Sequence, residues 1–132
     1  MAINKMKWML RILPLVYIFI VWLQSSLFNP GSIEETPGLG SILELGHLII
    51  FGVLYILIYF AWMTFGEVTP KMEAIIIIIT LFCALGDEMH QYYVPYRSAS
   101  LIDMVKNVMG IVVAWYVMRL VMKGRIKATR RI

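Results

Sequence analysis

Long apolar stretches constrain the fold of this chain more than any other feature. They run from about residue 12 to 28, 42 to 65, 74 to 85 and 101 to 122. The hydrocarbon core of a bilayer is about 30 Å thick and an α-helix rises about 1.5 Å per residue, so about 20 apolar residues cross it. Three stretches fall in that range, and 61% hydrophobic with only 15% charged residues excludes an ordinary soluble globule. The sequence predicts an integral membrane protein.

The third apolar stretch is too short to cross a bilayer alone. Residues 74–85 would span only about 18 Å as a helix. To cross, the helix must continue through Asp87 and Glu88, which places both carboxylates below the membrane surface. Alternatively, the helix ends early and residues 86–100 fold back as a re-entrant segment, which is tolerated only where protein or a wet cavity covers it. The sequence leaves both paths open.

We therefore predict an all-α, polytopic membrane protein, a bundle of four transmembrane helices with or without a re-entrant segment before the last one. A single domain is expected over residues 1–132, with helices at about 8–28, 42–65, 74–92 and 101–122. Pro14 should lie near the start of the first helix, and Ser98 or Ser100 should cap the last. Basic residues flank both termini, so the positive-inside rule predicts a multi-pass cell-membrane protein with cytoplasmic N- and C-termini.

One interval gathers most of the polar groups of the membrane region. Residues 86–110 hold Asp87, Glu88, His90, Gln91, Arg97, Asp103, Lys106 and Asn107. Ionisable side chains are unfavourable in hydrocarbon, so such a cluster between apolar stretches is a functional-site hypothesis. We expect Lys106 to pair with Asp103 or Glu88, and Arg119 to extend to the inner interface.

The expected topology brings three polar groups to the same membrane depth. The second helix begins outside with Glu44 and His47, which are three residues apart and share one face. The third helix ends outside with its cluster of carboxylates, and the fourth begins outside with Asp103 and Asn107. Helical spacing keeps each group on one face of its helix. We therefore predict a polar pocket at the outer leaflet.

The residue types suggest acid–base and anion-binding chemistry in this pocket. Close carboxylates and a histidine exchange protons near neutral pH, and an arginine fork binds a phosphate or carboxylate in a bidentate manner. The candidate catalytic residues are Glu44, His47, Asp87 and Glu88. The candidate substrate-binding residues are His90, Gln91, Arg97, Asp103 and Asn107. A divalent metal is a possible cofactor, with His47, Asp87 and Glu88 as candidate ligands, although their spacing matches no strict ligand pattern. The alternative is that these groups serve only as hydrogen-bonding partners between helices.

Other classes of function find little support in the sequence. The net charge of +4 relates to orientation and lipid headgroups, and we expect no nucleic-acid binding. Cys83 is the only cysteine, so neither an intrachain disulfide nor a CxxC site is available. No nucleophile elbow or glycine-rich phosphate loop is present.

The polar interval resembles the signature of the VanZ-like family. That signature has the progression DE-x-H-Q, V-P-x-R-S and D-x3-N-x2-G, which this chain matches with Asp87, Glu88, His90, Gln91, Val94, Pro95, Arg97, Ser98, Asp103, Asn107 and Gly110. The resemblance covers roughly residues 40 to 115, and His47 resembles the family's histidine in the second helix. Where the family often has a lysine three residues before that histidine, this chain has Glu44.

The resemblance implies a bacterial cell-envelope protein, and the family's namesake is linked to resistance to the glycopeptide antibiotic teicoplanin. The first hypothesis is a pocket that binds or modifies an anionic, lipid-linked envelope substrate. The alternative is a non-enzymatic protein: a lipid or solute translocator, or an accessory membrane protein that binds the antibiotic. Expected partners are membrane lipid and a lipid-linked cell-wall precursor or glycopeptide. Whether the protein is an enzyme, its substrate and its oligomeric state are left open by the sequence.

Overall fold

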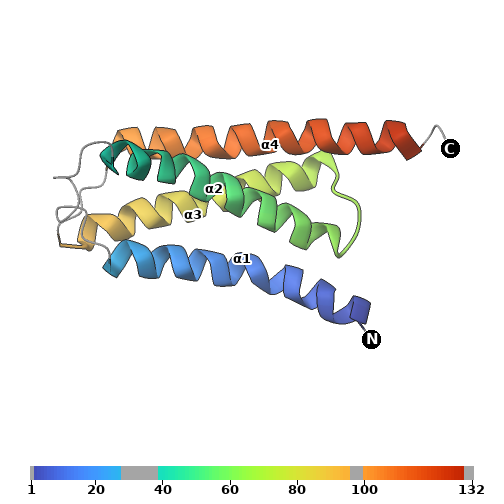
Figure 1. The fold of residues 1–132 in the computed structure, drawn as a ribbon, viewed down its shortest axis with the longest axis horizontal. Coiled ribbons are helices and arrows are strands. Elements are labelled where there is room, and N and C mark those ends of the chain that lie inside the picture. Colours follow the sequence, from blue (N-terminus) through green and yellow to red (C-terminus); the bar gives the residue numbers. More distant parts are fainter. Residues whose placement is uncertain (1, 28–38, 96–99, 130–132) are drawn as a thin grey trace.

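Four α-helices make up nearly all of the described chain. The structure, a computed structural model, describes residues 2–27, 39–95 and 100–129. The helices are α1 (Ala2–Leu27), α2 (Leu39–Met63), α3 (Pro70–Tyr93) and α4 (Leu101–Thr129). They run in alternating directions along one long axis (Figure 1). The predicted all-α fold with four helices is confirmed.

Length and composition support membrane insertion. Among the described residues, three segments are long and apolar enough to cross a bilayer: Ile3–Leu27, Gly46–Met63 and Leu101–Gly124. The helix α3 is not one of them, although its 24 residues extend over about 36 Å. Its two ends carry charged residues, with Glu73 in the first turn and Asp87 and Glu88 near the end. The chain is a membrane protein whose third helix carries charge into the bundle.

The helix α3 continues without a break past its apolar core. It begins at Pro70, four residues earlier than expected, because Thr69 caps it: the Thr69 side chain accepts a hydrogen bond from the Met72 backbone N–H, and proline suits the first helical position. It then continues through Asp87 and Glu88 to Tyr93. Of the two paths that the sequence left open, the continuous helix is the one observed up to Tyr93, while residues 96–99 lie outside the described chain.

The helix α1 begins earlier than predicted, at Ala2, whereas α4 begins at the predicted residue and ends later, at Thr129. Because α1 begins at Ala2, Pro14 lies inside the helix and not near its start as predicted. Proline in the interior of a membrane helix is tolerated where neighbouring helices compensate for the lost hydrogen bond. At the start of α4, the Ser100 hydroxyl accepts a hydrogen bond from the Ile102 backbone N–H at 3.2 Å, so Ser100 is the predicted cap. Ser98 lies outside the described residues.

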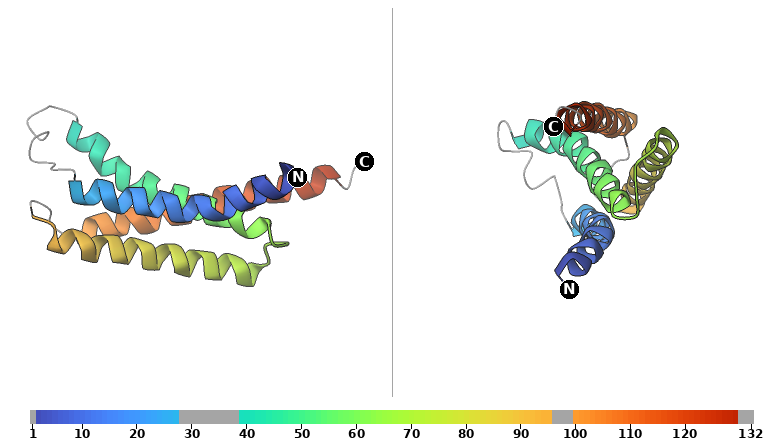
Figure 2. Two further views of the ribbon diagram at one scale, coloured as in Figure 1. Left: turned by 90° about the horizontal axis from the view of Figure 1, so that it is seen from below. Right: turned by 90° about the vertical axis from the view of Figure 1, so that its right-hand side faces the viewer.

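The central pair of the bundle is α2 and α4, which share the most extensive contact. They approach closely where Gly52 faces Gly110, since a Cβ added at Gly52 would lie 3.0 Å from the Gly110 carbonyl oxygen. Small residues permit such close packing of membrane helices. The helix α1 packs against α2 and α3 without contacting α4 (Figure 2). The buried core between the two ends is apolar or aromatic and consists of Phe51, Leu54, Tyr55, Tyr59, Ile76, Ala84, Ile111, Ala114 and Met118.

Polar side chains gather at the two ends of the bundle. We call the end that holds His47, Asp87, Glu88, Gln91 and Asn107 the polar end. We call the opposite end the basic end: it holds Arg11, Thr64, Glu73, Arg119 and Lys123. The start of α1 and the end of α4 both lie at the basic end, so α1 and α3 end, and α2 and α4 begin, at the polar end (Figure 1).

Candidate functional site

Glu88 joins α3 to the start of α4 at the polar end. Its Oε1 accepts a hydrogen bond from Asn107 Nδ2 at 3.3 Å, and its Oε2 accepts one from the Ser100 backbone N–H at 3.4 Å. The residue is only 7% exposed. Hydrogen bonds from neutral donors to a carboxylate help to keep it in place when it is removed from water. Glu88 is therefore the centre of the polar end.

Asp87 and Gln91 lie next to Glu88 on the same helix. Gln91 Nε2 donates to Asp87 Oδ2 at 2.7 Å, as their spacing of one helical turn allows. Both residues are buried. Two adjacent carboxylates thus enter the interior of the bundle from α3, and the Gln91 amide supports one of them.

The helices α2 and α4 contribute His47 and Asn107 to this cluster. The Glu88 carboxyl group lies within electrostatic range of His47 on α2 and of Asp103 on α4. Asn107 is completely buried. Its Oδ1 and the Nδ1 of His47 are both buried without a hydrogen-bond partner among the described residues. A buried polar atom without a partner costs about 1–3 kcal/mol, so these two atoms are available for a bound group.

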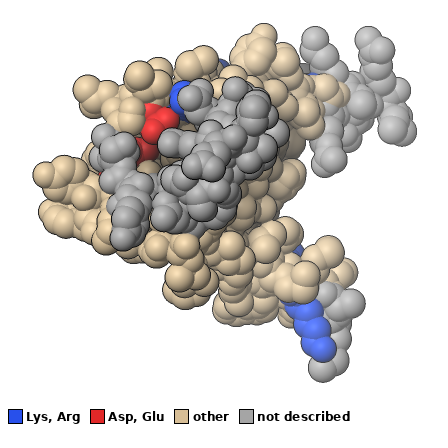
Figure 3. Space-filling model, turned by 60° about the vertical axis from the view of Figure 1, so that its left-hand side comes forward, with Lys and Arg blue, Asp and Glu red and all other residues tan. Residues whose placement is uncertain are grey.

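Asp103 and Lys106 form an ion pair at the edge of the cluster. Lys106 Nζ lies 3.2 Å from Asp103 Oδ1, and each of the two side chains is about one quarter exposed to solvent. The sequence predicted that Lys106 would pair with Asp103 or Glu88, and the pair with Asp103 is confirmed. Figure 3 looks toward this end and shows acidic groups beside a basic group.

His90 faces a different direction from its neighbours in the sequence. Its Nε2 lies 2.7 Å from the Ser26 hydroxyl, and its ring stacks on Trp22 with the two planes only 4° apart. Both partners belong to α1. A position two residues after Glu88 lies about 200° around the helix, so His90 points to α1 while Glu88 points to α4. The structure does not bring His90 to the carboxylate cluster.

Two predicted site residues cannot be placed in the cluster. The side chain of Glu44 and the whole of Arg97 lie outside the described part of the chain. Within the described part, no three His, Cys, Asp or Glu side chains are close enough together to hold a metal ion. His47, Asp87 and Glu88 therefore do not make up a metal site by themselves.

Residues from different parts of the VanZ-like sequence pattern meet at the polar end. The carboxylates come from the first part of this pattern and Asn107 from its last, and they meet through the Asn107–Glu88 hydrogen bond. The sequence model of the VanZ/LLP1 family matches residues 2–122. This chain belongs to the VanZ/LLP1 family. No curated protein and no solved structure matches the chain.

The match to the VanZ/LLP1 family covers α1 to α3 and α4 as far as Met122, and the structure adds contacts that sequence reasoning missed. One is the pair of Ser26 and Trp22 with His90. Another is the contact of Gly110 with α2: a Cβ added at Gly110 would lie 1.9 Å from the Leu48 carbonyl oxygen. Gly110 was visible as part of the family pattern, but no local signal indicated which helix it touches.

The structure adds a partner for Arg119, which was expected to extend to the inner interface. Its Nε donates to Glu73 Oε2 at 2.9 Å, and its guanidinium lies 4.9 Å from the centre of the Trp115 ring. The pair joins α4 to the start of α3 at the basic end. An ionic partner in a partly buried position stabilises the guanidinium better than the apolar surface alone.

The polar end of this VanZ/LLP1 protein has the parts needed for proton transfer and hydrogen bonding. Asp87 and Glu88 are buried carboxylates, and His47 Nδ1 and Asn107 Oδ1 are buried without a hydrogen-bond partner among the described residues. Such groups hold or move protons at a polar ligand when they are within hydrogen-bond reach of it. The cluster is thus suited to bind a polar headgroup and to exchange protons with it.

Proposed function

We propose that the polar end of this VanZ/LLP1 membrane protein binds or modifies the headgroup of an anionic, lipid-linked substrate of the bacterial cell envelope. In this proposal, the activity contributes to tolerance of teicoplanin, as the family resemblance implies. The observation that carries the proposal is the meeting of Asp87, Glu88 and Asn107 in the buried interior, where Asn107 Nδ2 donates a hydrogen bond to Glu88 Oε1.

The unpartnered atoms favour a site over a purely structural role. Side chains that only join membrane helices bond to one another, and such bonds contribute about 0.6–2 kcal/mol each. At the polar end, His47 Nδ1 and Asn107 Oδ1 are buried and find no partner among the described residues. Each of these atoms reduces stability as long as it has no partner. A ligand that supplies the missing hydrogen bonds would remove this penalty.

The roles assigned to the residues follow from their chemistry. Glu88, supported by Asn107, is the proposed proton donor or acceptor, and His47 is its proposed titrating partner. Asp87 is the second carboxylate, oriented by Gln91. The anionic part of the substrate is assigned to Arg97, and this assignment rests on the sequence. The proposal places the polar end outside the cell and both termini in the cytoplasm.

The interior between the two ends argues against a translocation path. A path for a polar solute needs polar side chains along its length. The buried residues in the middle of the described bundle are apolar or aromatic, except for Thr80, whose hydroxyl donates to its own helix at Ile76 O. A pocket that opens at one end fits this distribution better than a channel.

The test is the teicoplanin tolerance of cells that express variants at equal levels. Glu88→Gln and His47→Gln keep approximate size and hydrogen-bonding capacity but remove titration, so both should fold normally and lose tolerance. Arg97→Lys should also reduce tolerance, because a lysine does not form the bidentate contact. Tyr92→Phe is the matched control, since this exposed residue lies at the same end of α3. Full tolerance in the three site variants would refute the proposal.

A further inference from the structure

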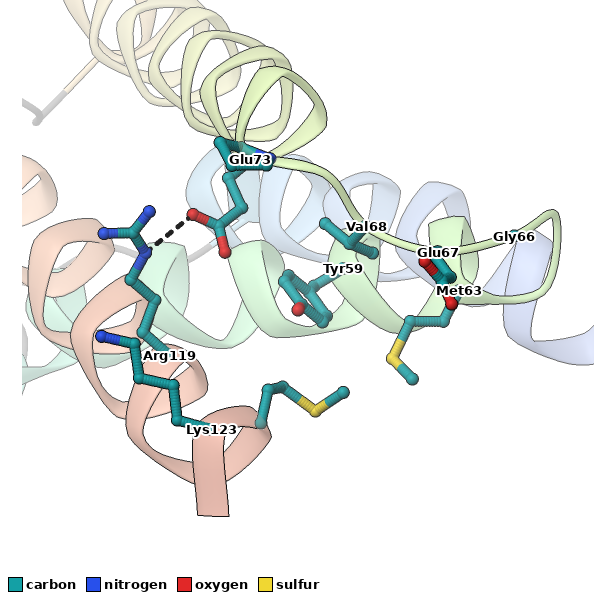
Figure 4. A pocket seen from close by; sticks show the side chains of 10 residues that line it. Tyr59, Met63, Gly66, Glu67, Val68, Glu73, Arg119 and Lys123 are labelled. Atoms are coloured by element: carbon teal, nitrogen blue, oxygen red, sulfur yellow. Dashed lines mark hydrogen bonds and ion pairs between the residues drawn. The ribbon is translucent and has the colours of Figure 1, made fainter. Parts of the chain in front are cut away.

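A cavity of about 690 Å³ opens at the basic end, far from the proposed site. It lies between the α2–α3 connection, the start of α3 and the last part of α4. Its volume is within the range of about 300–1,000 Å³ that is typical of small-molecule sites. Figure 4 shows Glu73, Arg119 and Lys123 on one side of the cavity, and Tyr59, Met63, Val68 and Glu67 on the other.

The guanidinium of Arg119 is held in a fixed orientation at this cavity. Its Nε donates to Glu73 Oε2 at 2.9 Å, and the same oxygen accepts a hydrogen bond from Trp115 Nε1 at 3.2 Å. The Glu73 side chain is only 13% exposed, whereas that of Arg119 is 40% exposed. The two terminal nitrogens of Arg119 have no hydrogen-bond partner in the described part of the chain. They are therefore available to an anion, for which the planar fork is well suited.

A second cation stands beside Arg119. Lys123 is one helical turn further along α4, is exposed, and forms no ion pair with another described residue. In Figure 4 the ammonium of Lys123 and the guanidinium of Arg119 lie on the same side of α4, and both residues line the cavity. Glu73 already forms an ion pair with Arg119. Glu67 lies across the cavity on the exposed α2–α3 connection. Two cations one helical turn apart can share one phosphate group.

The remaining wall of the cavity is apolar. It consists mainly of Tyr59, Met63, Val68 and Met122. A free anion would make no use of this surface, while an amphiphile would cover it with hydrocarbon and gain about 25 cal/mol for each Å² removed from water. The cavity thus combines a phosphate-sized cationic rim with a surface for an acyl chain.

The depth of the cavity matches the position of lipid phosphates. The membrane-spanning segment of α2 ends at Met63, and that of α4 ends at Gly124. Both Met63 and Lys123 line the cavity, so it lies where the hydrocarbon core meets the headgroups. Basic side chains at the ends of membrane helices are well placed for lipid phosphates.

We propose that the basic-end cavity binds a membrane phospholipid, with its phosphate between Arg119 and Lys123 and the start of an acyl chain on the apolar wall. The bound lipid fills the space between α4 and the α2–α3 connection and so joins these elements. This proposal is independent of the function assigned to the polar end, because the two sites share no residue.

The test measures binding of short-chain phosphatidylglycerol to the purified full-length protein in neutral detergent by native mass spectrometry. The wild type should retain one lipid per chain. Lys123→Ala should weaken binding about fivefold, which corresponds to about 1 kcal/mol. Val68→Phe should also weaken it, because the larger side chain takes up space on the apolar wall. Lys71→Ala is the matched control: this exposed lysine lies at the same end but does not line the cavity, and its removal should leave binding unchanged.

Two results would overturn the proposal. Equal loss of binding in Lys123→Ala and Lys71→Ala would show that the lipid responds only to the general surface charge. Binding of inorganic phosphate or glycerol phosphate as tightly as the lipid would show a site for a free anion, with no contribution from the apolar wall. The expected result is that both water-soluble probes compete only at concentrations at least tenfold higher than the lipid.

Discussion

Replacing Gly110 by alanine tests how α2 and α4 position the polar end. The added Cβ would lie 1.9 Å from the Leu48 carbonyl oxygen and 2.9 Å from the Leu48 carbonyl carbon. Real Cβ atoms essentially never come closer than 3.0 Å to such atoms, so the helices must separate by about 1 Å. The obstacle is backbone, which does not move aside as a flexible side chain does. Overpacking of this kind costs about 1–3 kcal/mol, and we expect Gly110→Ala to fall near the upper end.

The matched control is Gly46→Ala in α2. A Cβ at Gly46 meets nothing within 4 Å, so the substitution should be neutral or stabilise the helix by up to about 1 kcal/mol. Unfolding of the purified variants by SDS in mixed micelles, followed by tryptophan fluorescence, measures the difference. Gly110→Ala should unfold at a clearly lower SDS fraction than either the wild type or Gly46→Ala.

The same substitution should disturb the polar end. Leu48 follows His47 directly, and Asn107 lies about one turn before Gly110 on α4, so separating the two helices moves His47 away from Asn107 and Glu88. We therefore expect Gly110→Ala to lose tolerance as well as stability. If Gly110→Ala unfolds at the same SDS fraction as Gly46→Ala, the close approach of α2 and α4 is not as described, and the reasoning fails.

Two further predictions concern the edge of the polar end and its orientation. Asp103→Asn and Lys106→Met should each lower the free energy of unfolding by about 1–2 kcal/mol, because each leaves a charge with one partner fewer. The double variant should recover most of this loss. A double variant no more stable than the single ones would contradict the pairing. In a Cys83→Ala background, a cysteine introduced at Glu35 should react with an impermeant thiol reagent in intact cells and one at Thr129 should not; the reverse labelling would place the polar end inside.

The depth of the polar groups could be predicted from the sequence because it depends on lengths. The apolar run that ends at Leu85 is too short to cross alone, so the sequence predicted either a helix that carries Asp87 and Glu88 into the bundle or a re-entrant segment, and the structure shows the helix. The alternation of helix direction then placed His47 and Asn107 at the same end. Both inferences use only the rise per residue and the number of spans, which the sequence states directly.

Contacts that depend on how helices pack could not be predicted in this way. The Glu73–Arg119 pair joins residues that are 46 positions apart, so no local spacing signals it. Contact between Gly110 and Leu48 depends on the relative rotation of two helices. The orientation of His90 is an intermediate case, since helical periodicity separates it from Glu88 by about 200°, but only the structure shows that it meets Ser26.

The central claim is that the polar end binds an anionic lipid-linked substrate, and a binding measurement tests it most directly. The full-length protein in nanodiscs of neutral lipid would be titrated with a polyprenyl phosphate, alongside Glu88→Gln, Arg97→Lys and the control Tyr92→Phe. We predict saturable binding by the wild type and the control, and binding at least about tenfold weaker, or about 1.4 kcal/mol, in the two site variants. Equal binding by all four proteins would contradict the claim.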